Sequence, residues 1–216
     1  EKTEKKLADA KTAIDDGKKE LKTKTDDAQK KLNERIRKYA EDTAKEYVEY
    51  AHNKGLKVGL YNARHVLWDN DMQGWGVRDS AITDEYGNPV ALAKTDSTYG
   101  VVKNSIPIDP TSDHFKNDVK NFMSTYTGIG FDYLKIDFLN FCTLEGNYAD
   151  SSITTGMQAY NQALKMFTDY VDTDKFFLSY SIAPLFPYQY AHARRISCDT
   201  ADDIGETSYM LNSLNY

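Results

Sequence analysis

The chain has 216 residues, which is enough for one good-sized core or two small ones. It carries 33 acidic and 27 basic side chains, a formal net charge of -6, and this balance argues against nucleic acid or an anionic membrane as a partner. No apolar run approaches the ~20 residues that a membrane-spanning helix needs, and no signal peptide is recognisable.

The first thirty residues differ in composition from the rest. Residues 1–30 are highly charged and poor in aromatic side chains, with an apolar residue every seven positions as far as Leu21. A coiled coil needs two apolar positions per heptad, and the second position is poor here. We therefore expect a thin amphipathic helix, or a helical hairpin broken near Gly17, that acts as a solvated arm, an insertion or a partner-binding helix. The predicted domains are this arm and an α/β domain over 31–216.

From residue 32 onward, helical and strand patterns alternate. The expected elements are a helix over 32–54, a strand at 56–61, a hairpin turn at 85–89, a helix from 111 or 112, a strand within 131–140, a helix over 157–171, strands at 176–181 and 194–199, and a helix from 204. Such alternation predicts a parallel sheet with right-handed crossovers, as in a (β/α)8 barrel or an open flavodoxin-like sheet. No glycine-rich phosphate loop supports a nucleotide site.

The strand within 131–140 places charge on one of its faces. Residues alternate across a strand, so Leu134 and Ile136 point one way while Lys135 and Asp137 point the other. Burying charge is costly unless the charge is paired. The pair is either a structural ion pair or a catalytic carboxylate that its lysine neighbour keeps ionised.

A second carboxylate stands near a cation at a later strand end. Arg195 is followed by Asp199 and Asp203, in a tyrosine-rich region. Cleavage of a glycosidic bond needs two carboxyl groups facing one pocket, one ionised and one protonated. Asp137 fits the ionised nucleophile, and a raised pKa would suit Asp199 to act as acid and then base.

The loops that follow the strands supply further candidates. Long loops inside a compact domain are usually functional. Trp68 and Asn140 lie in such segments and are predicted to contact substrate, since aromatic-rich loops suit the faces of sugars. No spacing of histidines and acids predicts a metal site, and we expect no cofactor. Cys142 and Cys198 either pair, if their strands are neighbours, or remain two free buried thiols.

Three motifs occur in order along the chain. They are Gly-Leu-Lys-Val-Gly-Leu-Tyr at 55–61, Tyr-Leu-Lys-Ile-Asp at 133–137, and Arg-Ile-Ser-Cys-Asp-Thr-Ala-Asp-Asp at 195–203. Together they resemble the α-galactosidases of glycoside hydrolase families 27 and 36, in clan D. The resemblance covers residues 35–216 and corresponds to the central part of the catalytic barrel.

The resemblance implies a mechanism and a role for each matching residue. Asp137 falls on the family's nucleophile and Asp199 on its acid/base. Lys135 and Arg195 fall on positions that contact sugar hydroxyls, and Tyr61 on a residue of the pocket wall. The implied reaction is a retaining double displacement through a covalent glycosyl-aspartate, on a terminal α-linked sugar and without a metal.

The sequence departs from the family at both ends and in one loop. The early strands, with their paired-aspartate motif, and the last strands are absent, so we expect an incomplete (β/α)8 barrel and a chain that is a processed or excised piece. The loop after Tyr180 lacks the family's usual polar sugar-reading residue, which leaves the sugar open. The alternatives are a non-catalytic or degenerate carbohydrate-binding barrel and a helical interaction protein. The composition fits a secreted or cell-surface bacterial protein, and the oligomeric state is open.

Overall fold

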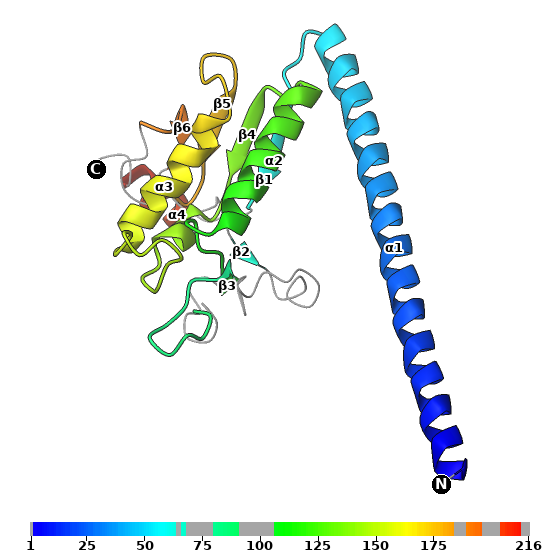
Figure 1. Cartoon of the computed structure of the whole chain (residues 1–216). Coiled ribbons are helices and arrows are strands. Elements are labelled where there is room, and N and C mark those ends of the chain that lie inside the picture. The colour runs from blue at the N-terminus through cyan, green and yellow to red at the C-terminus, as the bar shows by residue number, and fades with distance from the viewer. Residues whose placement is uncertain are drawn as a thin grey trace. The chain divides into compact units, whose positions relative to one another are not determined.

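The computed structural model describes residues 2–63, 66–67, 80–90, 106–183, 189–195 and 204–212. Figure 1 labels the elements along the chain. They are α1 (Lys2–Asn53), β1 (Gly59–Asn62), β2 (Val66–Leu67), β3 (Ile106–Pro107), α2 (Asp113–Ile129), β4 (Tyr133–Ile136), η3 (Leu139–Thr143), α3 (Gly156–Asp169), β5 (Phe177–Tyr180), β6 (Ala193–Arg194) and α4 (Ile204–Asn212). The chain divides into two compact units, Glu1–Tyr50 and Ala51–Tyr216.

The first unit is one continuous helix, α1. The expected break near Gly17 is wrong, because α1 runs without interruption from Lys2 to Asn53. A glycine inside a helix costs only about 1 kcal/mol relative to alanine, and good helix formers, Lys18 to Leu21, follow this one. Within the helix expected over 32–54, the apolar residues Val48 and Ala51 are buried, whereas Leu32 and Ile36 are exposed. The functional division at residue 30 stays a prediction.

Glycine ends α1 in the expected way. Gly55 has a left-handed backbone (φ 74°), and the N–H of Leu56 donates to the carbonyl oxygen of Ala51 at 3.0 Å. Only glycine adopts this conformation without a steric penalty, so it marks the C-terminal end of the helix. The chain then enters β1, which begins three residues later than the strand expected at 56–61.

The second unit is built on a parallel sheet. Its strand order is β1-β4-β5-β6, so the strands of this sheet lie beside one another in the order in which they occur in the chain, while β2 and β3 form a separate antiparallel pair. This order contains no reversal, as a barrel requires of its strands, whereas an open doubly wound sheet reverses at one point. The expected parallel sheet is therefore confirmed. β6 begins at Ala193, one residue before the strand expected at 194–199, and residues 196–203 lie outside the described residues.

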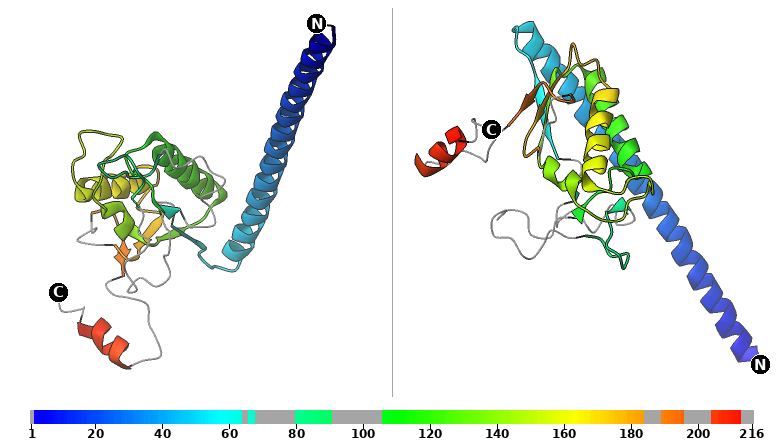
Figure 2. Two further views of the ribbon diagram at one scale, coloured as in Figure 1. Left: turned by 90° about the horizontal axis from the view of Figure 1, so that it is seen from below. Right: turned by 90° about the vertical axis from the view of Figure 1, so that its left-hand side faces the viewer.

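Helices α2 and α3 lie side by side over one face of the sheet (Figures 1 and 2). That face presents Leu134, Ile136 and Leu178, all almost fully buried. The rings of Phe115 in α2 and Phe167 in α3 meet edge to face at 6.3 Å. The alternation read from the sequence is therefore correct, because the apolar side of β4 lies under helices.

The opposite face of the sheet is more open at the amino ends of its strands. Phe177 keeps 43% of its surface exposed, and its ring stacks between those of Tyr133 and His192 at 5.7 and 5.1 Å. The ring of Tyr133 lies over Gly59, where a Cβ atom would clash with it. Glycine at this position is therefore required by the close approach of the neighbouring ring.

The start of α2 follows the predicted capping. Ser112 is the N-cap, and its Oγ accepts the N–H of Phe115 at 3.2 Å. The expected turn around 85–89 is also present, since Asp84 Oδ1 accepts the N–H groups of Tyr86 and Asn88. Serine and aspartate side chains favour these positions because they satisfy backbone donors that lack partners.

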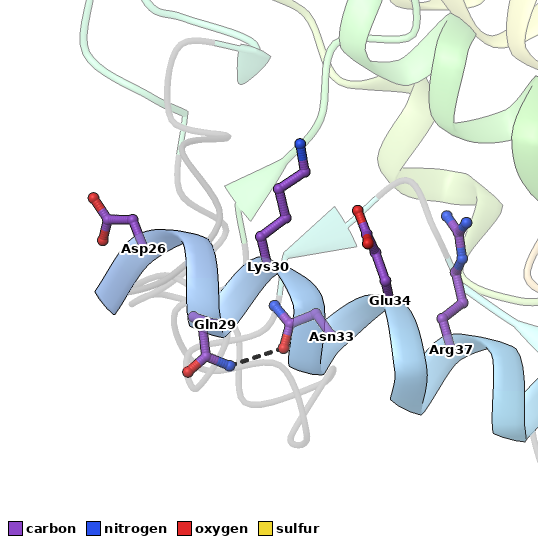
Figure 3. A pocket seen from close by; sticks show the side chains of 6 residues that line it. All are labelled: Asp26, Gln29, Lys30, Asn33, Glu34 and Arg37. Carbon is purple, nitrogen blue, oxygen red and sulfur yellow. Dashed lines mark hydrogen bonds between the residues drawn. The ribbon is translucent and has the colours of Figure 1, made fainter. Parts of the chain in front are cut away.

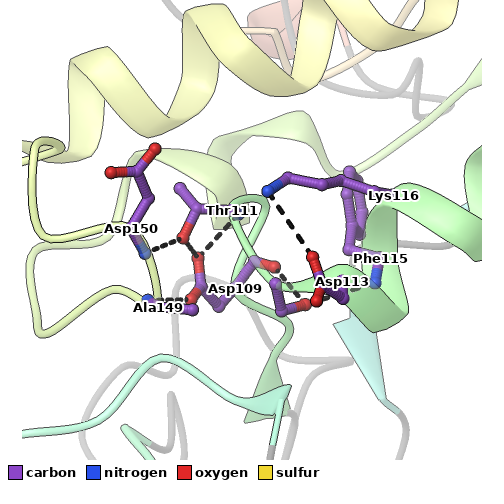
Figure 4. A network of polar contacts seen from close by, with 8 residues as sticks. Asp109, Thr111, Asp113, Phe115, Lys116, Ala149 and Asp150 are labelled. Carbon is purple, nitrogen blue, oxygen red and sulfur yellow. Dashed lines mark hydrogen bonds and ion pairs between the residues drawn. The ribbon is translucent and has the colours of Figure 1, made fainter.

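A buried carboxylate joins the start of α2 to the loop after η3 (Figure 4). Asp109 is 2% exposed. Its Oδ1 accepts the N–H and the hydroxyl of Thr111, both at 2.8 Å, and its Oδ2 accepts the N–H of Ala149 at 2.6 Å. The Thr111 hydroxyl in turn accepts the N–H of Asp150 at 3.0 Å. A buried charge with three donors is satisfied, and it fixes the two segments together.

Replacing Asp109 with Asn tests this junction. The amide would turn its NH2 group toward the N–H of Ala149, which leaves two donors facing each other. We expect the free energy of unfolding to fall by about 1–3 kcal/mol, measured by denaturant unfolding. The control is Asp113→Asn, because the Asp113 side chain is 96% exposed and surface changes stay within about 0.5 kcal/mol. Equal stability of the two variants would contradict the assigned role of Asp109.

Candidate active site

The predicted site residues of β1 and β4 meet at the carboxyl end of the sheet. The register pairs Tyr61 with Lys135, and Lys135 with Ser179, so these three residues form one row. Asp137 follows one residue after β4 ends, and its N–H donates to the carbonyl oxygen of Asn62 at 3.0 Å. The parallel pairing thus continues to the carboxylate, which is 6% exposed.

The two oxygens of Asp137 have different partners. Oδ2 accepts the hydroxyl of Tyr61 at 3.2 Å and lies 4.0 Å from Nζ of Lys135. Oδ1 accepts the backbone N–H of Phe138 at 2.8 Å. The Lys135 ammonium also stands 5.5 Å from the centre of the Tyr61 ring. A hydroxyl, an ammonium and a backbone N–H thus surround one carboxylate. The structure therefore brings together three of the predicted residues: Tyr61, Lys135 and Asp137.

Asn140 lies in the short helix η3, immediately after this strand end. Its N–H donates to the carbonyl oxygen of Ile182 at 2.9 Å. Its side-chain Oδ1 is buried and has no hydrogen-bond partner. The backbone of η3 is thus anchored to the loop after β5, while the amide oxygen keeps its capacity to accept a hydrogen bond.

The remaining candidates extend toward the end of the sheet. Arg195 follows β6 directly, and its N–H donates to the carbonyl oxygen of Tyr180 at 2.8 Å, which continues the pairing with β5. Trp68, Asp199 and Asp203 lie outside the described residues, as does Cys198. Cys142 is a free, buried thiol in η3, and burial raises the pKa of that thiol.

Two backbone features at the site were not anticipated from the sequence. Phe138 and Ile182 have left-handed backbones, with φ of 56° and 46°. Phe138 supplies the N–H that binds Asp137. Neither residue is a glycine or asparagine, the types that usually mark this conformation, so the sequence carries no signal for it.

A second carboxylate stands at the opposite end of β4. Asp132 Oδ2 lies 2.7 Å from Nε2 of His52 and accepts the N–H of Val58 at 3.0 Å, and Oδ1 accepts Lys57 Nζ at 2.7 Å. Burial acts to raise the pKa of Asp132, but the bonds from Lys57, Val58 and His52 outweigh it and lower that pKa to about 2. At the amino end of a parallel strand such a group serves stability rather than chemistry.

The stability that Asp132 provides should depend on pH. Its folded pKa lies below the ordinary value of 3.8, so its contribution is present above pH 4 and is lost as pH falls toward 2. We expect Asp132→Asn to lower the free energy of unfolding at pH 7 by roughly 2 kcal/mol. Denaturant unfolding of parent and variant from pH 7 to pH 2 measures the difference. A gap that stays constant over this range would contradict the assigned pairing.

Two hollows lie away from the carboxyl end of the sheet. One, of ≈ 490 Å³, borders the amino ends of the strands, near Asp132 and Phe177. The other, of ≈ 410 Å³, lies along α1, and every described residue that lines it belongs to that helix (Figure 3). These residues are Asp26, Gln29, Lys30, Asn33, Glu34 and Arg37. Neither hollow includes the Asp137 carboxylate, and neither is the candidate site.

Over the described ranges of the chain, no group of three or more His, Cys, Asp or Glu side chains is placed to hold a metal ion. None of the helices described there is long and apolar enough to cross a membrane.

Comparison with solved structures reveals glycoside hydrolases of the same fold. The chain superimposes on an α-galactosidase from Thermus thermophilus, solved in complex with stachyose, with a TM-score of 0.60 and 20% identity, covering 78% of this chain and 35% of that one. It also matches the α-N-acetylgalactosaminidase NagBb from Bifidobacterium bifidum, in complex with GalNAc, with a TM-score of 0.51 and 15% identity over 70% of this chain and 23% of that one. A third match is the glycoside hydrolase domain of PelA, variant E218A, from Pseudomonas aeruginosa (TM-score 0.54, 12% identity, 79% of this chain and 66% of that one).

These structural matches confirm, at the level of fold, the resemblance to α-galactosidases that the three sequence motifs indicated. The chain has the fold of part of an α-galactosidase-type glycoside hydrolase domain, and it spans about a third of the length of the α-galactosidase that it matches. No family model matches the sequence, and no curated protein matches it.

Proposed function

We propose that the chain forms part of the catalytic barrel of a retaining α-glycosidase that acts on terminal α-linked sugars, α-galactosides or related glycans. The observation that carries the proposal is the carboxylate of Asp137, which Tyr61 and Lys135 surround at the carboxyl end of a parallel sheet. Active sites of (β/α)8 barrels lie at this end. The likeness in fold to an α-galactosidase supports the same proposal.

In the proposed reaction Asp137 is the nucleophile. One of its oxygens attacks the anomeric carbon while the bond to the leaving oxygen breaks, and Asp199 donates a proton to that oxygen. Water then attacks the same carbon, Asp199 takes back a proton, and the sugar leaves with its original anomeric configuration. Lys135 and Tyr61 stabilise the charge that returns to Asp137 in this second step.

The remaining candidates are proposed to hold the sugar. Lys135 and Arg195 would contact hydroxyl groups, as the family resemblance implies, with Trp68, Asn140 and Asp203 completing the pocket. In a retaining glycosidase the two catalytic carboxyl groups lie about 5–5.5 Å apart. The proposal therefore requires this separation between the carboxyl groups of Asp137 and Asp199.

Replacing Asp137 with Asn tests the nucleophile. We expect aglycone release from an aryl α-glycoside to fall by roughly 10³-fold or more, because an amide cannot form the glycosyl ester. The assay uses a panel of α-galactoside, α-N-acetylgalactosaminide and α-glucoside, with circular dichroism to verify folding. The control is Asp132→Asn at pH 7, which removes the carboxylate at the other end of β4 and should leave release near the parent's rate. An undiminished rate in Asp137→Asn would exclude the proposed mechanism.

A non-catalytic carbohydrate-binding barrel is the second candidate. It is favoured by the loop after Tyr180, Ser-Ile-Ala-Pro at 181–184, which lacks the usual polar sugar-reading residue of the family that the motifs resemble. Saturable sugar binding by calorimetry, with no reducing sugar formed, would support the binding function over the catalytic one.

A further inference from the structure

Two neighbouring strands end in the same unusual conformation. In the register of β4 and β5, Ile136 pairs with Tyr180, so Phe138 and Ile182 each lie two residues beyond a matched pair. Both have positive φ, 56° and 46°. Among the described residues, these two alone combine a positive φ with a residue other than glycine. The two chains thus turn left-handed at the same level of the sheet.

The turn after β5 supplies acceptors for the start of η3. The first N–H groups of a helix have no partners within it, and Phe138 at the N-cap of η3 provides no side-chain bond. The N–H of Asn140 donates to the carbonyl oxygen of Ile182 at 2.9 Å, and that of Leu139 to Ser181 at 3.5 Å. The backbone of the β5 loop therefore caps η3.

The conformation at Ile182 is strained. A left-handed backbone brings Cβ close to the following carbonyl oxygen, and a β-branched side chain makes this conformation a rare exception. Glycine would make the same turn without that penalty. Strained backbones of this kind persist where surrounding contacts enforce them, and they gather at functional sites.

We propose that Ile182 is a positioning residue, whose left-handed backbone caps η3 and thereby holds Asp137 and Asn140 in working geometry. Phe138 links the two ends of this arrangement, because it is the N-cap of η3 and also donates its N–H to Oδ1 of Asp137. A shift of η3 would therefore move a hydrogen-bond donor of the carboxylate. The positioning role of Ile182 concerns the proposed glycosidase reaction and therefore rests on that proposed function.

The comparison of Ile182→Gly with Ile182→Ala tests the backbone role. Both variants remove the branched side chain, but alanine keeps the penalty for positive φ. At an ordinary backbone position glycine is less stable than alanine, whereas at positive φ the order reverses. We expect the glycine variant to melt about 2–4 °C above the alanine variant. A glycine variant that melts below the alanine variant would overturn the proposal.

Amide exchange and kinetics test the positioning role. The Asn140 N–H should exchange faster with solvent in Ile182→Ala than in Ile182→Gly. At a temperature where both variants are fully folded, we expect the kcat of Ile182→Ala to be about 10-fold lower than that of Ile182→Gly, with a similar KM. Such a difference indicates lost transition-state stabilisation. Ile182→Asn, which tolerates positive φ, should restore kcat. If Ile182 had only a structural role, the folded alanine, glycine and asparagine variants would have the same kcat. That result would overturn the positioning role.

The readouts separate this inference from the proposed function. If the parent chain releases no aglycone from any glycoside of the panel, the proposed function fails. The melting order and the Asn140 exchange rate do not depend on turnover, so they still decide whether Ile182 caps η3.

Discussion

The backbone pairing of β1, β4 and β5 is the constraint on which the candidate site depends. Side chains alternate along each strand, so the register decides which residues from distant parts of the chain stand in one row. It places Tyr61 beside Lys135, and the backbone pairing continues past the last residue of β4 to Asp137. A slip of one residue would turn Lys135 and Asp137 under the helices, where a charge would lack partners. The apolar face of β4 beneath α2 and α3 opposes such a slip.

The two ends of β4 show how one sheet separates stability from chemistry. Asp132 before the strand and Asp137 after it each accept hydrogen bonds on both oxygens. The donors around Asp132 are His52, Lys57 and Val58, and their bonds join the segment before β1 to the start of β4. The partners of Asp137 come from two parallel strands and from a left-handed turn, at the end of the sheet where barrels bind substrates. The same chemical group thus serves folding at one end and, we propose, catalysis at the other.

Much of this arrangement could be predicted from the sequence because it is local. The alternation of Leu134 and Ile136 with charged residues, and the cap at Ser112, follow from side-chain type and spacing. The site could be predicted only in part. The hydroxyl of Tyr61 reaches Asp137 across 76 positions of sequence, and no local pattern reports such a contact. The left-handed backbone of Ile182 is enforced by tertiary contacts against its own preference, so reasoning from propensity must miss it. At Gly17 the sequence suggested a break that the structure does not have, because one unfavourable residue does not end a strongly helical segment.

The central claim is that Asp137 becomes covalently attached to the sugar. The most direct measurement is the mass of the protein and its peptides after incubation with a fluorinated, activated α-galactosyl fluoride, a reagent that slows hydrolysis of the glycosyl-enzyme. The account predicts one added sugar, located on the peptide that contains Asp137 and absent when Asp137 is replaced with Asn. A label on another carboxylate, or fluoride release with no labelled protein at any time, would contradict it.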